Sequence, residues 1–291
     1  MSLQEKWTTM KALFIINPIS GKGRKGKIIA ALEGTQHSYV VTEYAGQAEE
    51  LARTATQEIV VAVGGDGTVN EVARGLLGTD KILGILPCGS GDGLARCLGI
   101  SHHISKALET INNGIVKPLD AGFINGKAFF SVCGVGFDAD VSKKFAEAGK
   151  RGLMTYIEQS LQLWHDFKPQ TFSISIDGKQ WEQKAVLVTV GNSNQWGNNA
   201  KVTPHASCHD GILDVTVLDM FHSIELPDLA TRLMAGHCDT NHRVHCYKGK
   251  HIIIERESPG VAHFDGDWFE TGRTLDISIR PAALKVIVPS R

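Results

Sequence analysis

Short apolar runs alternate with amphipathic segments along the first 120 residues of the chain. The runs are rich in β-branched residues and end at Gly or Pro, which is typical of strands buried on both faces of a parallel sheet. We predict strands at Ala12–Ile16, Tyr39–Thr42, Ile59–Val63 and Ile82–Leu86. We predict helices at Lys25–Leu32, Ala48–Thr56, Val69–Leu77 and Ser105–Asn112. The alternation indicates a parallel α/β sheet with right-handed crossovers, whose ligands bind beyond the carboxyl ends of the strands.

The pattern changes after Asp120 and becomes strand-rich. A hairpin with a tight Asp177-Gly178 turn is predicted, and amphipathic helices are predicted near Gly152–Trp164 and Leu226–Ala235. Further strands are predicted at Phe172–Ile176, Ala185–Val190, Leu213–Leu218, Val244–Tyr247, His251–Glu255, Leu275–Ile279 and Lys285–Val288. We therefore predict two domains: an α/β domain over residues 1–120 and an antiparallel, sandwich-like domain over residues 121–291, whose last strand is able to return to the first domain.

Composition and charge narrow the class of protein. The 291 residues contain 30 Lys+Arg and 31 Asp+Glu, a formal charge of −1, whereas nucleic-acid-binding proteins usually carry a basic excess. No apolar run reaches the roughly 18 residues that a membrane-spanning helix needs, and Met1–Met10 lacks the apolar core of a secretory signal. We expect a cytoplasmic protein that binds no nucleic acid and has no transmembrane segment.

The cysteines and histidines offer no familiar metal motif. The six cysteines form no C-x-x-C pair, and we expect free, mostly buried thiols. The stretch richest in metal-ligating side chains contains His237, Cys238, His242, His245 and Cys246. Its spacing fits no common zinc template, so we interpret these residues as surface and strand positions.

A basic, glycine-rich segment follows the first predicted strand. Gly21 to Lys27 reads G-K-G-R-K-G-K, which matches both the GxGxxG dinucleotide fingerprint and the GxxxxGK P-loop. Ile28 stands where a P-loop carries the hydroxyl for Mg²⁺, and the first Gly lies several residues beyond the strand. A solvated basic loop that opens a helix is the simpler alternative, yet a loop this basic suits a polyanionic ligand.

The segment Gly64–Val72 carries the sharpest signal. It follows a buried strand and opens a helix, and Thr68 with Glu71 forms a T-x-x-E capping box that predicts a helix start at Thr68. Three glycines allow backbone N–H groups to approach a phosphate there: Gly64, Gly65 and Gly67. Asp66 lies among them and indicates Mg²⁺ handling or a proton acceptor beside a phosphoryl group. The simpler alternative is a Gly-rich turn with a capping Asp.

A second glycine loop, Pro87-Cys88-Gly89-Ser90-Gly91-Asp92, follows the next strand and leads into a helix. Loops after neighbouring parallel strands lie on the same rim of a sheet. We therefore expect the two loops to form opposite walls of one cleft.

Taken in order, these and later motifs resemble the diacylglycerol kinase catalytic family, which includes bacterial lipid kinases and sphingosine kinases. The matching segments are Asn17-Pro18-x-Ser20-Gly21, Gly64–Thr68, Pro87-x-Gly89-Ser90-Gly91, Gly134-x-Gly136-Phe137-Asp138-Ala139 with Gly152 and Tyr156, Asp210-Gly211-Ile212-Leu213-Asp214, and Asp265-Gly266-Asp267. They run through nearly the whole chain, and six motifs in the right order are far more specific than any one of them.

The resemblance implies an ATP-dependent kinase that phosphorylates a lipid hydroxyl, with a nucleotide-binding domain first and a β-rich lipid-acceptor domain second, in the fold of NAD kinases and diacylglycerol kinases. It implies nucleotide contacts at Asn17, Ser20, Gly21, Gly64, Gly65, Gly67, Thr68, Glu71, Gly89, Ser90, Gly91 and Asp267. It assigns the base to Asp265, with Asp66 as the alternative, and it implies a structural Mg²⁺ at Asp210, Asp214 and the Ile212 carbonyl. For Asp210 and Asp214, an equally weighted alternative to metal binding is that they are turn residues before a strand.

Two residues depart from the family pattern. Asp92 stands where the family commonly has Asn, which adds negative charge near the nucleotide, and Asp267 stands where it usually has Glu. Candidates for balancing phosphate charge are Lys22, Arg24, Lys150 and Arg151, although solvated surface positions are the commoner role. Candidates for lining an acceptor pocket, more often core residues, are Phe129, Phe130, Trp164, Phe167 and Trp196.

The expected partners are a lipid at the inner membrane surface, reached by peripheral contact, and a second copy of the chain in a homodimer. A kinase of soluble NAD shares a Gly-Gly-Asp-Gly loop and a similar two-domain plan, so it is the enzymatic alternative. The Asn17–Gly21 loop and the Asp265–Asp267 motif favour the lipid enzyme. A non-catalytic lipid- or nucleotide-binding relative is the alternative from another class.

Overall fold

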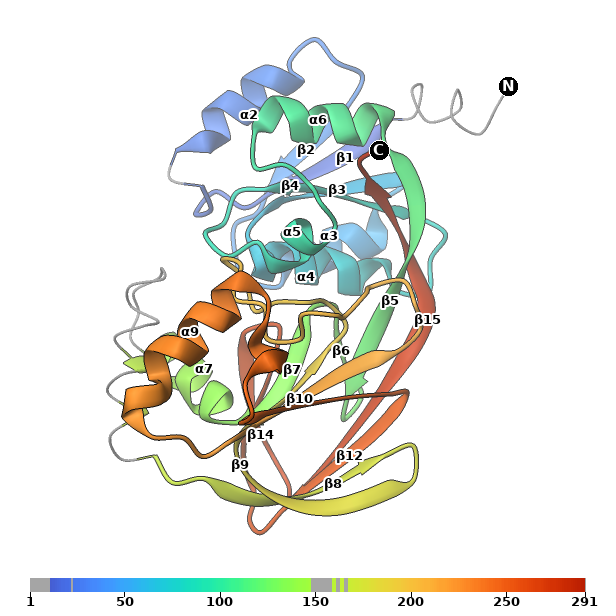
Figure 1. The fold of residues 1–291 in the computed structure, drawn as a ribbon. Helices are drawn as coiled ribbons and strands as arrows, with labels where there is room; N and C mark the ends of the chain where they lie inside the picture. Colours follow the sequence, from blue (N-terminus) through green and yellow to red (C-terminus); the bar gives the residue numbers. More distant parts are fainter. Residues whose placement is uncertain (1–10, 22, 148–158, 161–162, 165–166, 291) are drawn as a thin grey trace. The chain divides into compact units, whose positions relative to one another are not determined.

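A computed structural model describes residues 11–21, 23–147, 159–160, 163–164 and 167–290 of the chain (Figure 1). The chain divides into two compact units: Met1–Asp120 with Pro281–Arg291, and Ala121–Arg280. No helix among the described residues is long and apolar enough to cross a bilayer.

The first unit is a parallel sheet covered by helices. Its elements in chain order are β1 (Ala12–Ile16), α2 (Arg24–Leu32), β2 (Ser38–Val41), α3 (Gln47–Thr54), β3 (Ile59–Gly64), α4 (Asp66–Leu76), β4 (Ile82–Pro87), α5 (Gly93–Cys97) and α6 (Ile104–Asn113). The strand order is β2-β1-β3-β4, all parallel, and Lys285–Val286 of β15 (Thr274–Val288) continues it in parallel to β4. Helices α2 and α6 lie on one face of this sheet, and α3 and α4 lie on the other (Figure 1).

A continuous apolar core fixes these layers. Phe14 of β1 and Val61 of β3 are register partners and are both fully buried. Ile28 of α2 and Ile111 of α6 pack in the same cluster, as does Ile287 of β15. Strands buried on both faces explain why the sequence reads there as unbroken β-branched runs.

The second unit is an antiparallel assembly of strands. Its elements are β5 (Ile115–Ile124), which enters from the first unit, β6 (Lys127–Phe129), β7 (Val132–Gly136), α7 (Phe137–Glu147), β8 (Gln170–Ile176), β9 (Lys179–Gly191), β10 (Leu213–Asp219), η1 (Ser223–Glu225), α9 (Leu226–Ala235), η2 (Cys238–Thr240), β11 (Val244–Gly249), β12 (His251–Arg256), β13 (Gly260–Phe264) and β14 (Asp267–Thr271). Strand β9 pairs with β8 along its first half, and with β7 and β10 along its second half. The predicted class, a parallel α/β part followed by an antiparallel, sandwich-like part, is confirmed.

Two strands are longer than predicted. Trp181 and Ala185–Val190 belong to one strand, β9, and the predicted strands Leu275–Ile279 and Lys285–Val288 are both parts of β15. The helix predicted near Gly152–Trp164 falls largely outside the described residues.

Candidate functional site

Three loops meet at the carboxyl ends of β1, β3 and β4. The backbone N–H of Asn17 donates to the Val63 carbonyl at 3.0 Å, and that of Cys88 donates to the Gly64 carbonyl at 2.8 Å. Gly21 has a positive φ of 80°, and a Cβ built on it would lie 3.1 Å from the Cβ of Cys88. The first, second and third glycine-rich segments therefore form one rim within the first unit, as expected for a ligand site of a parallel sheet.

Asn17 joins the first loop to helix α4. Its Nδ2 donates to Thr68 Oγ1 at 3.0 Å, and its Oδ1 accepts the backbone N–H of Ile19 at 3.0 Å. The capping box predicted for Thr68 and Glu71 is therefore wrong. Helix α4 begins at Asp66, its N-cap makes no side-chain hydrogen bond, and Glu71 instead accepts the backbone N–H of Ala48 at 3.3 Å. The buried Thr68 hydroxyl instead accepts the hydrogen bond from Asn17 in the neighbouring loop.

The glycines of the two central loops allow a close approach of backbone to backbone. A Cβ on Gly89 would lie 2.7 Å from the Cα of Gly65 and 2.6 Å from Asp92 Oδ1. A Cβ on Gly64 would lie 2.4 Å from the Thr68 hydroxyl. Gly67, by contrast, has open space around it. Glycine is therefore required at Gly89 by the packing of the two loops on each other, and at Gly64 by the Thr68 side chain.

Asp66 ties the second loop to the third. Its Oδ1 accepts the backbone N–H of Gly93 at 2.7 Å. Burial raises the pKa of Asp66, and hydrogen bonds from the backbone N–H groups of Gly93, Asp92 and Leu94 oppose that rise. The carboxylate thus acts as an anionic cap for the start of α5, and it braces the rim where the resemblance places phosphates.

Asp92 adds a second carboxylate to this rim. It is 2% exposed and adopts a left-handed backbone conformation, with φ 46°, at the N-cap of α5. Its Oδ1 accepts the backbone N–H of Gly89 at 3.1 Å, and its Oδ2 lies 3.2 Å from His102 Nδ1. Burial, and then the nearby charge of Asp66, raise the pKa of Asp92 to about 7.

The remaining nucleotide-contact candidates line the same rim. Ser20 follows Asn17 in a turn, Ser90 is exposed at the tip of the third loop, and the Gly91 carbonyl accepts Arg96 Nε at 2.9 Å. Of the basic candidates, Arg24 lies in α2 and donates to the His102 carbonyl at 3.4 Å. Lys22, Lys150 and Arg151 lie outside the described residues.

In the second unit, Asp265 organises a tight turn between β13 and β14. Asp265 and Gly266 both have positive φ, 51° and 88°. The Asp265 carboxylate accepts the backbone N–H groups of Phe130, Ser131 and Val132 at 2.8, 2.7 and 3.1 Å. A carboxylate offers about four lone-pair positions, so most of this one serves the backbone. Asp267, two residues on, is exposed.

Arg256 secures the other end of the same hairpin. It is 8% exposed, and its guanidinium donates to the carbonyls of Val261 and Gly260, each at 2.7 Å, and to those of Thr271 and Gly272. Burial lowers the pKa of Arg256. The hairpin that carries Asp265 and Asp267 is therefore held by side chains at both ends.

The two acids of the predicted structural Mg²⁺ site lie at the start of β10 and in the turn before it. Asp210 Oδ1 accepts the backbone N–H of Ile212 at 3.2 Å. Asp214 faces its cross-strand partner Lys248, with Oδ2 and Nζ 3.2 Å apart. Burial raises the pKa of Asp214, and Lys248 opposes that rise. Asp214 Oδ2 is buried and makes no hydrogen bond, and the assignment of Asp210, Asp214 and the Ile212 carbonyl to a structural Mg²⁺ stays a prediction.

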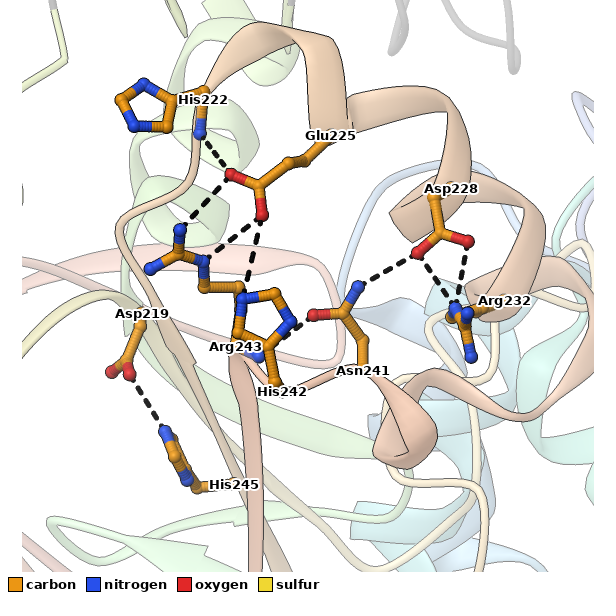
Figure 2. Close-up of polar contacts among 9 residues, drawn as sticks. All are labelled: Asp219, His222, Glu225, Asp228, Arg232, Asn241, His242, Arg243 and His245. Atoms are coloured by element: carbon orange, nitrogen blue, oxygen red, sulfur yellow. Dashed lines mark hydrogen bonds and ion pairs between the residues drawn. The ribbon is translucent and has the colours of Figure 1, made fainter.

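The histidines of the segment 237–246 contact different carboxylates. Figure 2 shows His245 directed at Asp219, 2.8 Å away, and His242 beside Glu225, at 3.9 Å. The backbone N–H of His222 and the Arg243 guanidinium lower the pKa of Glu225. Among the residues that the structure describes, no group of three or more His, Cys, Asp or Glu side chains is arranged to hold a metal ion.

Two of the proposed pocket-lining aromatics are core residues. Phe129 and Phe130 are fully buried, as the commoner core role predicts. Trp164 stacks on Phe221 at 4.3 Å between ring centroids, and Phe167 packs edge-on against Phe137 at 5.1 Å. Trp196 is half-buried.

Sequence reasoning missed a buried polar network next to the hairpin. Asp138 and His263 are each 2% exposed, with Oδ2 and Nε2 2.9 Å apart, and the Thr189 hydroxyl donates to the same carboxylate oxygen at 2.7 Å. His102 was missed as well. The pairing of distant strands brings the first three residues together, and no local pattern signals it.

Two family models match the chain. The model of the diacylglycerol kinase catalytic domain matches residues 11–124, and the model of the YegS C-terminal NAD kinase beta sandwich-like domain matches residues 131–288, more than half of the chain. A diacylglycerol kinase of Mycobacterium tuberculosis (strain H37Rv) is 30% identical over 297 residues, which cover 96% of this chain and 95% of that protein. The chain belongs to the diacylglycerol kinase family.

Other members of the diacylglycerol kinase family show the same extent of similarity. A diacylglycerol kinase of Bacillus subtilis is 29% identical over 273 residues, covering 89% of this chain and 90% of the relative. A crystal structure of a protein assigned as a diacylglycerol kinase, from Bacillus anthracis, is 27% identical with a TM-score of 0.79 and covers 96% of this chain and 95% of its own. The members of this family are named as lipid kinases. This chain has the fold of the family.

Proposed function

We propose that the protein transfers the γ-phosphoryl group of MgATP to the hydroxyl of a diacylglycerol-like or related lipid presented at a membrane surface. The observation that carries the proposal is the meeting of the Asn17–Gly21, Gly64–Thr68 and Gly89–Asp92 loops on one rim of the sheet. Glycines that admit no side chain leave backbone N–H groups at the surface of such a rim, where they suit phosphate oxygens.

In this proposal the triphosphate lies against Gly64–Thr68 and Gly89–Gly91. Mg²⁺ arrives with ATP and neutralises part of the phosphate charge. Asn17 and Ser20 border the nucleotide, and Arg24 balances charge from α2. Phosphoryl transfer depends mainly on positioning and on charge neutralisation, which a rigid, backbone-lined rim supplies. No step is assigned to a structural Mg²⁺ at Asp210.

Two acids are candidates for accepting the proton of the lipid hydroxyl. Asp265 and Asp66 both hold backbone N–H groups through their carboxylates, so each has a bracing role whatever else it does. Asp267 is exposed on the turn that Asp265 organises. We assign the proton acceptor to Asp265, as the resemblance implies, with Asp66 as the alternative, and Asp267 stays a nucleotide contact.

Transfer of labelled γ-phosphate from MgATP tests the proposal on a panel of diacylglycerol, a sphingoid base, phosphatidylglycerol and NAD. We expect a labelled lipid product. Asp66→Asn should lower kcat/KM at least about 100-fold, because it removes the charge that holds α5 to the second loop. Asp80→Asn, which alters an exposed ion pair with Lys285 in the same unit, should leave activity unchanged.

The alternatives give different outcomes in the same assay. Labelling of NAD alone would replace the lipid assignment with a dinucleotide kinase. Nucleotide binding without transfer to any acceptor would favour a non-catalytic relative. An Asp66→Asn variant with full activity would remove Asp66 from the site.

A further inference from the structure

Asp92 occupies a position in which a carboxylate has to be neutralised. Its side chain is buried, it touches the third loop through the Gly89 N–H, and the carboxylate of Asp66 lies close enough to raise its pKa. An unpaired buried carboxylate is costly. His102, which follows α5, places Nδ1 3.2 Å from Asp92 Oδ2, which makes no hydrogen bond, and is its ion-pair partner when the imidazole is protonated.

Charged groups from several elements face this pair. Arg24 of α2 and Arg96 of α5 lower the pKa of Asp92, whereas Asp66 of α4 raises it. Burial, then Arg96, Arg24 and His103, lower the pKa of His102. The thiol of Cys88, at the end of β4, also faces Asp92, and burial raises the pKa of that thiol to about 11. Cys88 is therefore uncharged at neutral pH.

Asp92 and His102 are each hydrogen-bonded to a neighbouring segment. Asp92 Oδ1 accepts the Gly89 N–H, the carbonyl of His102 accepts Arg24 from α2, and Arg96 holds the Gly91 carbonyl. Asp92 and His102 thus connect the third loop to the helices that flank it. The net charge of the two side chains therefore lies next to this loop.

We propose that Asp92 and His102 are positioning residues whose combined charge sets how tightly the Gly89–Gly91 loop accepts an anionic phosphate. The inference rests on the proposed function for its ligand, a nucleoside triphosphate. With one proton the pair carries no net charge, as carboxylate with imidazolium or as acid with imidazole. When the pair loses that proton at higher pH, it gains a negative charge beside the loop, which repels a polyphosphate.

Binding of MgATP by titration calorimetry tests this proposal at about pH 6 and about pH 8, on either side of the ordinary histidine pKa. We expect wild-type affinity to fall about tenfold between the two values. Asp92→Asn should abolish that dependence and bind at least as tightly as the wild type at the lower pH, because the amide oxygen still accepts the Gly89 N–H. The KM for MgATP should follow these changes while kcat stays within about twofold.

A double-variant cycle separates charge pairing from a purely structural role. His102→Ala should weaken MgATP binding about tenfold in the wild-type background and have little effect in the D92N background, since an amide needs no charged partner. Equal weakening in both backgrounds would overturn the proposal, as would a wild-type affinity independent of pH.

The unfolding temperature tests the pair without any nucleotide. The pKa of Asp92 is raised in the folded state, so the folded protein binds this proton more tightly than the unfolded chain and loses stability as pH rises from about 4 to 7. Asp92→Asn should therefore raise the unfolding temperature more at about pH 8 than at about pH 5. If the wild type binds no MgATP, the proposed function fails, and with it the link to phosphate. The pairing then stands only if this pH-dependent shift is found, and an equal shift at both pH values would overturn it.

Discussion

Asp265→Ala should destabilise the protein more than any other single change in the candidate site. The substitution leaves the N–H groups of Phe130, Ser131 and Val132 without their acceptor, and these residues are at most 7% exposed. Each orphaned buried donor costs about 1–3 kcal/mol, so we expect a loss of about 3 kcal/mol or more in the free energy of unfolding, measured by urea denaturation.

Asp267→Asn provides the matched control on the same turn. Because Asp267 is exposed, its free energy of unfolding should change by no more than about 0.5 kcal/mol. If Asp267 contacts the nucleotide, the KM for MgATP should nevertheless rise. An Asp265→Ala variant as stable as the wild type would refute the bracing role, and an Asp267→Asn variant with an unchanged KM for MgATP would remove Asp267 from the nucleotide site.

Gly89→Ala should abolish tight binding of MgATP. The added methyl group would meet the Cα of Gly65 at 2.7 Å and the Asp92 carboxylate at 2.6 Å, so the third loop has to move away from the second. Because catalysis depends on sub-ångström positioning, we expect kcat/KM to fall more than about 100-fold. Gly26→Ala is the control, since Gly26 lies in α2 with open space around it, and alanine there should raise stability by up to about 1 kcal/mol. Wild-type affinity in the Gly89→Ala protein would show that the contact between the loops is dispensable.

The sequence predicts the bounds of a helix or strand best where the whole element packs in one kind of environment. Strand β1 and helix α9 have the predicted bounds, because an unbroken buried run and an amphipathic repeat with Gly236 at its end each signal themselves locally. Strand β15 was read as two strands because Pro281 and Ala282, which has φ 50°, interrupt its pattern. The two predicted pieces match two of its partners, β12 before the interruption and β4 after it.

The sequence predicts which loops form the candidate site, but not which groups form hydrogen bonds within it. Glycines at the ends of buried strands indicated which segments meet. The partners of Thr68, Asp66 and Asp265 are backbone or side-chain groups from other elements, between 27 and 135 residues away. A local motif cannot report such partners, which is why the T-x-x-E pattern was misread as a capping box. His102 escaped notice because a single histidine in a loop carries no pattern.

The return of β15 has a consequence for biosynthesis. Leu284, Val286, Ile287 and Val288 are buried, and Lys285–Val286 pairs with β4. A ribosome that has made the first 120 residues has therefore produced a sheet with a bare edge, and the missing strand emerges only after the whole second unit. Until then the nascent chain presents unpaired β4 amides and an incomplete core, the kind of surface that holdase chaperones cover.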